Sequence, residues 1–385
     1  MADEDIYVPP PDSNFSPIAP PQHEAPIPVP APSPQNQLDP DTLSQLVQQG
    51  YTTGLANALA ESCNSFPLRI WVVDNSGSMN NSDGNRLVPT KSSNDIKCVP
   101  CTRWKEIVDT IDYHSQMAAI LGAPTIFRLL NPPISPGVPQ EFSVADKGPE
   151  MIEEDLRIAR DVMSRTSPSG VTPLSWHVRE IKKQVESLAP SLQHEGKRVA
   201  IILATDGLPS NDRGVSGDAE LKEFAAAMRS LQGLPIWLVI RLCTGDSKVL
   251  DFYNSLDSQL ELSMEVIDDF LDEAKEMYEV NPWCNYCLPI HRMREMGFQH
   301  RIFDILDERK LTVSEIRDYC LLLFGKDNFD GIPEAEVDFK GFFLAVDGMV
   351  KRAGEQWHPV KKKPSSLISM KKLRKIYGEG TCTIM

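Results

Sequence analysis

Long apolar runs are missing from this sequence of 385 residues. No stretch approaches the roughly 18 consecutive apolar residues that a membrane-spanning helix needs. The opening residues, MADEDIYVPP, are acidic and contain neither the apolar segment of a secretory signal peptide nor the arginines of a transit peptide. These absences exclude a membrane-embedded transporter or receptor and predict a cytoplasmic protein. We expect its eight cysteines to be reduced thiols rather than a disulfide framework.

The motifs of common enzymes are also missing. The sequence contains no G-x-x-x-x-G-K-S/T phosphate loop and no H-E-x-x-H pair, and its seven histidines form no metal-binding array. No Ser-His-Asp arrangement can be assembled from its motifs. We therefore expect a protein that is not an enzyme.

Two CxxC pairs are the candidates for a thiolate metal site. Cys98 and Cys101 form one pair, and Cys284 and Cys287 form the other. The local spacing is that of a zinc site, but 182 residues separate the pairs instead of the usual gap of about 15 to 20. The long gap disfavours a shared zinc site, so we expect ordinary thiols, with zinc binding and redox chemistry as the alternatives.

Basic residues are scarce outside one segment. The net charge is −15, but residues 350–385 carry nine Lys or Arg against two Glu, a local charge of +7. The other 349 residues, with 30 basic and 52 acidic side chains, sum to −22. A body this acidic offers no clustered basic surface for phosphates, so no nucleic-acid partner is expected. Residues 351–385 are predicted to form a basic tail.

Proline is concentrated near the N-terminus. Twelve of the 31 prolines lie in the first 40 residues, where each removes a backbone donor and fixes an extended angle. Residues 1–37 are therefore predicted to be a disordered Pro-rich arm, with a ligand for a Pro-binding module as the alternative.

In residues 38–65 apolar side chains recur every three or four positions, which indicates an amphipathic helix or helix pair broken near Gly50. We expect this segment to pack on the next domain, and partner binding is the alternative.

Residues 66–280 alternate between short apolar runs and amphipathic helices. The runs IWVV, VAIIL and IWLVI are continuously apolar, which is typical of strands buried on both faces of a mostly parallel sheet. The pattern predicts a doubly wound, Rossmann-like α/β fold, in which ligands bind at the carboxyl ends of the strands. The predicted strands span residues 66–74, 125–131, 141–146, 197–206, 234–244 and 262–268.

Beyond this region the strand alternation stops, and residues 281–350 are predicted to be a small helical unit. Thr312 with Glu315 three residues later is a capping-box signature, and it starts a helix that should end before Gly325. Asp338 is expected to cap a second helix.

Oxygen-bearing side chains occur in three loops of the predicted sheet domain. Asp74, Ser76 and Ser78 come directly after the first strand, and Asp206 ends the strand KRVAIILATD. Thr172 lies in the loop SPSGVTPL, before a predicted helix. Carboxylates and hydroxyls are the hard donors that Mg²⁺ and Ca²⁺ prefer. The carboxyl edge of the sheet is therefore a candidate site for a divalent cation.

Together, the Asp-x-Ser-x-Ser run, the Gly-x-Thr-Pro-Leu loop and the Thr-Asp-Gly turn resemble the metal-ion-dependent adhesion site of von Willebrand factor A domains, across about residues 66–280. The resemblance implies Mg²⁺, or Ca²⁺ or Mn²⁺, bound by hydroxyls, with carboxylates acting through water. It also implies one coordination position left for a Glu or Asp carboxylate of a protein partner. Residues 80–103 depart from the family pattern as a long polar insertion that either shapes the partner surface or shields the site. The five matching positions are Asp74, Ser76, Ser78, Thr172 and Asp206.

The last four residues, Cys382-Thr383-Ile384-Met385, resemble a CaaX prenylation signal in which Met favours farnesyl. The lysine-rich segment upstream would supply the second signal that stable membrane anchoring requires. We therefore expect a peripheral protein at the cytosolic face of an anionic membrane. An incidental cysteine in a solvated basic tail is the alternative.

These features favour a metal-dependent protein-interaction scaffold that binds a partner carboxylate. Some intracellular domains of this family are subunits of chelatases and large ATPases, so a non-catalytic accessory subunit of such an assembly is the alternative. A fold whose metal site is present but unused is a third possibility.

Overall fold

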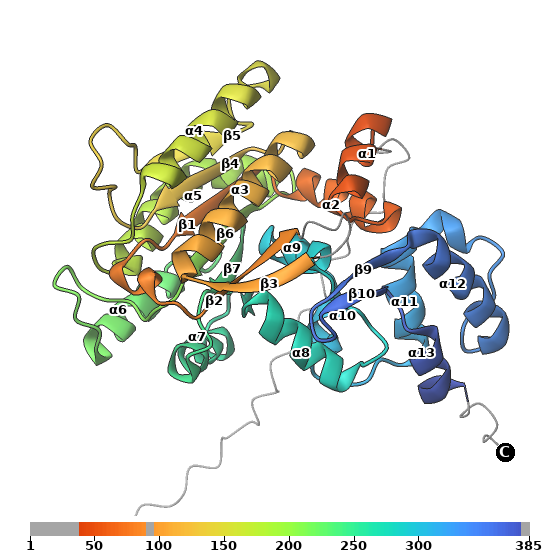
Figure 1. Cartoon of the computed structure of the whole chain (residues 1–385). Coiled ribbons are helices and arrows are strands. Elements are labelled where there is room, and N and C mark those ends of the chain that lie inside the picture. Colours follow the sequence, from red (N-terminus) through yellow and green to blue (C-terminus); the bar gives the residue numbers. More distant parts are fainter. Residues whose placement is uncertain (1–37, 90–95, 379–385) are drawn as a thin grey trace, which may run out of the picture. The chain divides into compact units, whose positions relative to one another are not determined.

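The centre of the structure is a six-stranded sheet (Figure 1). The computed structural model describes residues 38–89 and 96–378, so the predicted Pro-rich arm (1–37) and Cys382 lie outside the described residues. The strand order is β5-β4-β1-β6-β7-β8, and each neighbouring pair is parallel except β4 with β5. The strands are β1 Leu68–Val73, β4 Thr125–Leu129, β5 Glu141–Val144, β6 Val199–Thr205, β7 Ile236–Leu242 and β8 Met264–Ile267.

This sheet confirms the predicted α/β class, with a mostly parallel sheet flanked by helices. Each of the six predicted strands contributes one strand to it. The physical reason is burial on both faces, as in β6, where every residue is buried. A strand covered on both sides gains from apolar side chains at successive positions, so its sequence is a continuous apolar run.

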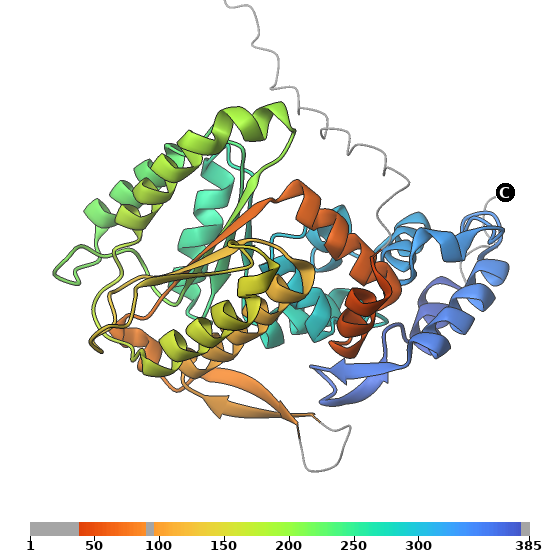
Figure 2. The same cartoon turned by 90° about the horizontal axis from the view of Figure 1, so that it is seen from above.

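Helices cover both faces of the sheet, as Figure 2 shows. Ile70 and Val72 of β1 pack in one layer with α5, α6 and α7, whereas Trp71 and Val73 pack on the opposite face with α3 and α4. The alternation follows from the two-residue period of a strand. These helices are α3 Arg103–Leu121, α4 Ile152–Arg165, α5 Leu174–His194, α6 Asp218–Arg229 and α7 Ser247–Gln259.

The strand order brings two of the candidate loops together. Numbered along the chain, the strands of the sheet stand in the order 3-2-1-4-5-6, which is a doubly wound arrangement. The order reverses between β1 and β6, and ligands of such sheets bind beyond the carboxyl ends of the strands at this point. Asp74 follows β1 directly, and Asp206 follows β6 directly. Both carboxylates therefore lie at the crevice that this topology creates.

The insertion at residues 80–103 contains a β-hairpin, which its polar sequence did not reveal. In it, β2 Gly84–Pro89 pairs antiparallel with β3 Ile96–Cys101. The hairpin is attached to α3, because the backbone N–H of Asn85 donates a 2.8 Å hydrogen bond to the carboxylate of Glu106.

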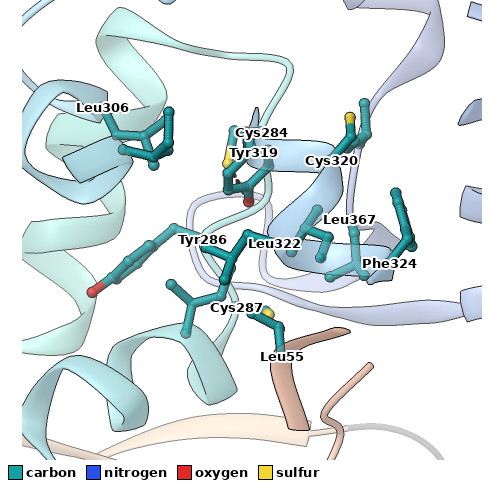
Figure 3. Packing of buried hydrophobic residues seen from close by; sticks show 14 of the residues in the cluster. Leu55, Cys284, Tyr286, Cys287, Leu306, Tyr319, Cys320, Leu322, Phe324 and Leu367 are labelled. Carbon is teal, nitrogen blue, oxygen red and sulfur yellow. Dashed lines mark hydrogen bonds between the residues drawn. The ribbon is translucent and has the colours of Figure 1, made fainter. Parts of the chain in front are cut away.

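The two N-terminal helices pack in different directions: the second packs on α11 (Val313–Phe324) from the other end of the chain, and the first packs on α3 of the sheet domain. α1 Pro40–Gln48 and α2 Thr53–Ser65 are separated at Gly50, whose φ of +92° confirms the predicted break. Leu55 of α2 lies in a buried cluster with Leu322 (Figure 3). The prediction that residues 38–65 pack on the sheet domain is therefore correct in part, because the segment also packs on the C-terminal helices.

The C-terminal part of the chain is mainly helical. Thr312 and Glu315 form the predicted capping box, each accepting a hydrogen bond from the backbone N–H of the other. The helix ends before Gly325, and Asp338 caps the next helix, both as predicted. The helices are α8 Phe270–Val280, α9 Leu288–Glu295, α10 Arg301–Leu306, α11 Val313–Phe324, α12 Phe339–Ala353 and α13 Met370–Tyr377.

Residues 351–385 are predicted to be a basic tail, but much of this segment is folded. β9 Glu355–His358 pairs antiparallel with β10 Lys363–Ser366, and Leu373 of α13 is fully buried. Tyr278 joins the hairpin to the helix, because the ammonium groups of Lys361 and Lys372 lie 5.8 and 4.3 Å from the centre of its ring. Lys361 of the hairpin turn and Lys372 of α13 therefore both lie beside Tyr278. Within the described ranges, no helix combines the length and the apolar character needed to cross a membrane.

A buried ion network joins α9 to the sheet. The carboxylate of Glu295 is fully buried and accepts hydrogen bonds from Arg241 of β7 at 3.2 Å, from His114 of α3 at 2.9 Å and from Arg292 at 2.6 Å. Burial by itself raises the pKa of Glu295, but the charges of Arg292 and His291 and the bond from His114 bring it well below its usual range. Glu295 is therefore the shared anion of this junction.

Candidate metal centre

Asp74 is the most deeply buried of the five predicted ligands. Its side chain is fully buried directly after β1, where Oδ1 accepts a 2.8 Å hydrogen bond from the backbone N–H of Ser76. Oδ2 accepts a 2.7 Å hydrogen bond from Thr205 Oγ1 at the end of β6. The first bond closes a local Asx-type turn, which directs the following residues back across the strand end. The second bond ties this turn to the neighbouring strand.

Ser76, Ser78 and Asp206 form a connected row of oxygen atoms. Ser78 Oγ donates a 2.8 Å hydrogen bond to Asp206 Oδ1, and Ser76 Oγ lies 3.0 Å from Ser78 Oγ. Because Ser78 gives its proton to the carboxylate, Ser76 is the donor in the second contact. Two loops that are far apart in the sequence thus share one polar row.

Thr172 belongs to the third loop, which is bonded to the other two. Gly77 N donates to Gly170 O at 3.3 Å, linking this loop to the one after β1. Thr172 N donates to Ser210 Oγ at 2.9 Å, which links it to the loop after β6. The Thr172 side chain faces that loop, since a Cβ built on Gly207 would lie 4.0 Å from Thr172 Oγ1. The structure therefore brings all three predicted loops to one place.

The oxygen spacing suits a small divalent cation. Mg²⁺ takes oxygen ligands at about 2.0 to 2.1 Å in octahedral geometry, so neighbouring ligands lie about 2.9 Å apart. The two serine oxygens, which are the proposed direct ligands, lie 3.0 Å apart; this agrees with that value and is also an ordinary hydrogen-bond length. Within residues 38–89 and 96–378, no three His, Cys, Asp or Glu side chains are grouped to hold a metal, so an ion here depends on the hydroxyl groups. The donor set fits Mg²⁺ and is unsuited to a soft metal.

The electrostatics of the site reflect two buried carboxylates. Burial and the nearby charge of Asp206 raise the pKa of Asp74 to about 6, although the bonds from Thr205 and Ser76 oppose this shift. Two anions in a low-dielectric crevice repel each other, and a cation between them relieves that repulsion.

Arg103 supplies a cation beside the site, and the sequence analysis missed it. Its Nη1 donates a 2.8 Å hydrogen bond to Asp206 Oδ2. Its Nε and Nη2 donate to the two oxygens of Asp83, at 2.6 and 2.5 Å. Arg103 is the first residue of α3, where a positive charge is unfavourable toward the helix dipole. A positive residue at the start of a predicted helix was the only sequence feature that could have indicated that Arg103 pairs with an acidic side chain elsewhere.

Three exposed apolar side chains lie in or beside the loops at the carboxyl edge of the sheet. Ile134 follows β4 and is 75% exposed, Trp176 lies in the first turn of α5 at 53%, and Val215 follows β6 at 55%. Their loops are connected, because Asn131 Nδ2 donates a 2.8 Å hydrogen bond to Val171 O and a Cβ on Gly214 would lie 3.1 Å from Val171. We call Ile134, Trp176 and Val215 the apolar rim. These residues could not be identified from the sequence, because a single apolar residue in a loop has no periodic pattern that shows whether its side chain is exposed.

The cysteine pairs are not arranged as a joint ligand set. Cys98 and Cys101 are three positions apart in the extended strand β3, so their side chains point to opposite faces. Cys284 and Cys287 are buried in the cluster of Figure 3. Burial raises the pKa of each of these two thiols to about 12, which keeps them protonated and unreactive.

No protein-family model matches the chain, and a search of curated proteins finds no match to it.

Proposed function

We propose that this protein is a divalent-metal-dependent protein-interaction scaffold, built on a von Willebrand factor A-type domain at about residues 66–280. The observation that carries the proposal is the hydrogen-bonded oxygen row from Ser76 through Ser78 to Asp206, at the point where the strand order reverses. The hydroxyls of Ser76, Ser78 and Thr172 would hold Mg²⁺ directly, and the carboxylates of Asp74 and Asp206 would act through water. The Ser78 hydroxyl is hydrogen-bonded to Asp206, but that carboxylate is also paired with Arg103, which weakens it as a base. The proposal is therefore a binding protein and not an enzyme.

A protein partner that offers a Glu or Asp side chain fits the surroundings of the site. A bound divalent ion held by neutral hydroxyls supplies positive charge and an open position that favours a carboxylate. The apolar rim supplies surface that a protein can bury, with Trp176 as the largest side chain. Aromatic side chains are enriched among the residues that dominate binding energy at protein interfaces.

Metal titration of purified protein tests the proposal. Isothermal titration with Mg²⁺ and Mn²⁺ is expected to show binding to wild type and at least about tenfold weaker binding to Asp74→Ala. Asp212→Ala removes an exposed carboxylate from the loop after β6 and is the matched control. Equal affinity of wild type and Asp74→Ala would count against the site. Affinity purification with and without EDTA then identifies the partner, and an EDTA-sensitive ATPase would favour the accessory-subunit alternative.

We also propose that the protein contacts an anionic membrane through a basic surface. This surface consists of Lys361, Lys362, Lys363, Lys371, Lys372, Arg374 and Lys375. The contacts of Tyr278 with Lys361 and Lys372 support it, because they hold the hairpin and α13 together. Each Lys or Arg near an anionic leaflet contributes about 1 kcal/mol. Prenylation of Cys382 stays a prediction, because that residue lies outside the described ranges.

A further inference from the structure

We propose that Arg103 is a resident counter-ion that competes with the divalent cation for Asp206, and that Asp83 of the insertion holds it in position. The inference rests on the proposed metal site and concerns how tightly that site binds its ion. It gives the insertion at residues 80–103 a defined role, since the insertion brings a charged pair to the edge of the oxygen row.

The insertion is closed where Asp83 meets Arg103. Arg103 N donates a 3.0 Å hydrogen bond to Asn81 O. Gly84 packs directly on the backbone of the same turn, since a Cβ there would lie 2.9 Å from Thr102 O. These contacts keep Asp83 opposite the guanidinium, which it engages through two parallel hydrogen bonds. A bidentate pair of this kind fixes the orientation of an arginine as well as its position.

Arg103 already neutralises part of the charge that would attract a metal. The side chain of Asp206 is fully buried and that of Arg103 is 10% exposed, so their 2.8 Å ion pair is weakly screened by water. Among the described residues, no other Lys or Arg forms an ion pair with Asp74 or Asp206. The arginine therefore stabilises the Asp206 carboxylate in the metal-free protein. The same charge repels an incoming cation.

Asp83 has the opposite effect to Arg103 on cation binding. Its side chain is 53% exposed, and its negative charge offsets that of Arg103. Neutralising Arg103 should strengthen metal binding. Asp83→Asn keeps one oxygen that accepts a hydrogen bond from Arg103, so the guanidinium stays in place while its charge is no longer offset, and metal binding should weaken. If the pair only supported the local fold, breaking it from either side would weaken binding. The sign of the two effects therefore separates competition from a structural role.

Titration of the metal alone into wild type and four variants tests the predicted order of affinities. For both Mg²⁺ and Mn²⁺, Arg103→Gln is expected to bind about tenfold more tightly than wild type, and Asp83→Asn to bind several-fold more weakly. The double variant Arg103→Gln with Asp83→Asn leaves neither charge unpaired, and its affinity is expected to lie between those of Arg103→Gln and wild type. It also serves as the test if a single variant fails to fold. Arg103→Lys retains the charge and is expected to bind within about threefold of wild type.

The possible results distinguish this inference from the proposed function. If wild type binds the ions and both Arg103→Gln and the double variant bind them equally or more weakly, competition is wrong while the metal site stands. If neither wild type nor Arg103→Gln binds either ion, both proposals are overturned. If Arg103→Gln binds the ions more tightly than wild type, and adding Asp74→Ala abolishes that binding, both the metal site and the competition by Arg103 are supported.

Discussion

Gly54 of α2 lies directly against the backbone of Gly325, at the end of α11. A Cβ at position 54 would lie 2.3 Å from Gly325 N and 2.5 Å from Leu322 O, which is closer than real Cβ atoms approach. Because backbone atoms cannot move aside as a flexible side chain can, Gly54→Ala should separate the two helices. We expect it to lower the free energy of unfolding by about 1 to 3 kcal/mol or more in chemical denaturation.

A second glycine in a helix provides the control for that prediction. A Cβ on Gly348 of α12 would meet only the end of the Arg352 side chain, at 3.5 Å. Gly348→Ala is therefore expected to raise stability by about 0.5 to 1 kcal/mol, because alanine is the better helix former. Destabilisation of similar size in both variants would show that the contact with Gly325 is not the cause.

Replacing Glu295 with Gln should destabilise the junction between α9 and the sheet. The substitution keeps the shape but leaves the buried charge of Arg241 without its partner on α9. Removing one member of a buried ion pair costs about 3 to 5 kcal/mol. Glu141→Gln, which breaks a more exposed pair with Arg128, is the control and is expected to cost less than about 1 kcal/mol. Urea unfolding followed by circular dichroism measures both, and equal losses would contradict the role of Glu295.

The fold class was predictable because its signal is local. The central strands β1, β6 and β7 contain the continuous apolar runs IWVV, VAIIL and IWLVI, and the helix beginning after Thr312 carries its cap in the adjacent residues. The contact of Gly54 with Gly325 was not predictable, since it joins two segments that are distant in the sequence. Nothing in the residues around Gly54 identifies its neighbour.

The candidate site divides in the same way. Asp74, Ser76 and Ser78 share one short motif, and the strand order brings Asp206 to them. The pairing of Arg103 with Asp206 depends instead on how the insertion folds back on α3. The strands of that hairpin, GNRLVP and IKCVPC, are short and show no regular alternation of apolar and polar residues that would reveal them.

Thr172→Val should weaken metal binding without unfolding the protein. Valine has nearly the same shape as threonine, and the Thr172 backbone bonds to the loop after β6 are unaffected. Loss of the hydroxyl removes one proposed ligand, so we expect about tenfold weaker binding of Mg²⁺ in isothermal titration. Thr172→Ser retains the oxygen and is expected to bind within about threefold of wild type. Unchanged affinity in the valine variant would remove Thr172 from the ligand set.

Charge reversal on the basic surface should release the protein from anionic vesicles. Lys371→Glu with Lys375→Glu changes two exposed positions on α13, and binding to phosphatidylserine vesicles is expected to fall at least tenfold in sedimentation assays. Lys183→Glu with Lys222→Glu makes the same change in net charge on α5 and α6, and it should bind like wild type. Equal loss in the two double variants would mean that total charge, rather than this surface, controls binding.

Stability should fall as the pH drops below about 6.5, in part because of His177. Its side chain is 1% exposed, and burial lowers its pKa to about 4, while Arg128, Glu141 and Glu180 act more weakly. The unfolded chain takes up a proton below about pH 6.5, whereas the folded protein resists protonation until about pH 4. The stability that His177 contributes is therefore complete above pH 6.5 and is lost as the pH falls toward 4.

His177→Gln isolates this contribution from that of the other buried histidines. Glutamine can donate to Leu130 O as His177 Nε2 does at 2.9 Å, but it does not titrate. Between pH 7 and pH 4.5, the free energy of unfolding should fall by about 2 kcal/mol less in this variant than in wild type. His194→Gln changes an exposed histidine at the end of the same helix and serves as the control. Parallel pH curves for wild type and His177→Gln would show that His177 titrates alike in the folded and unfolded states.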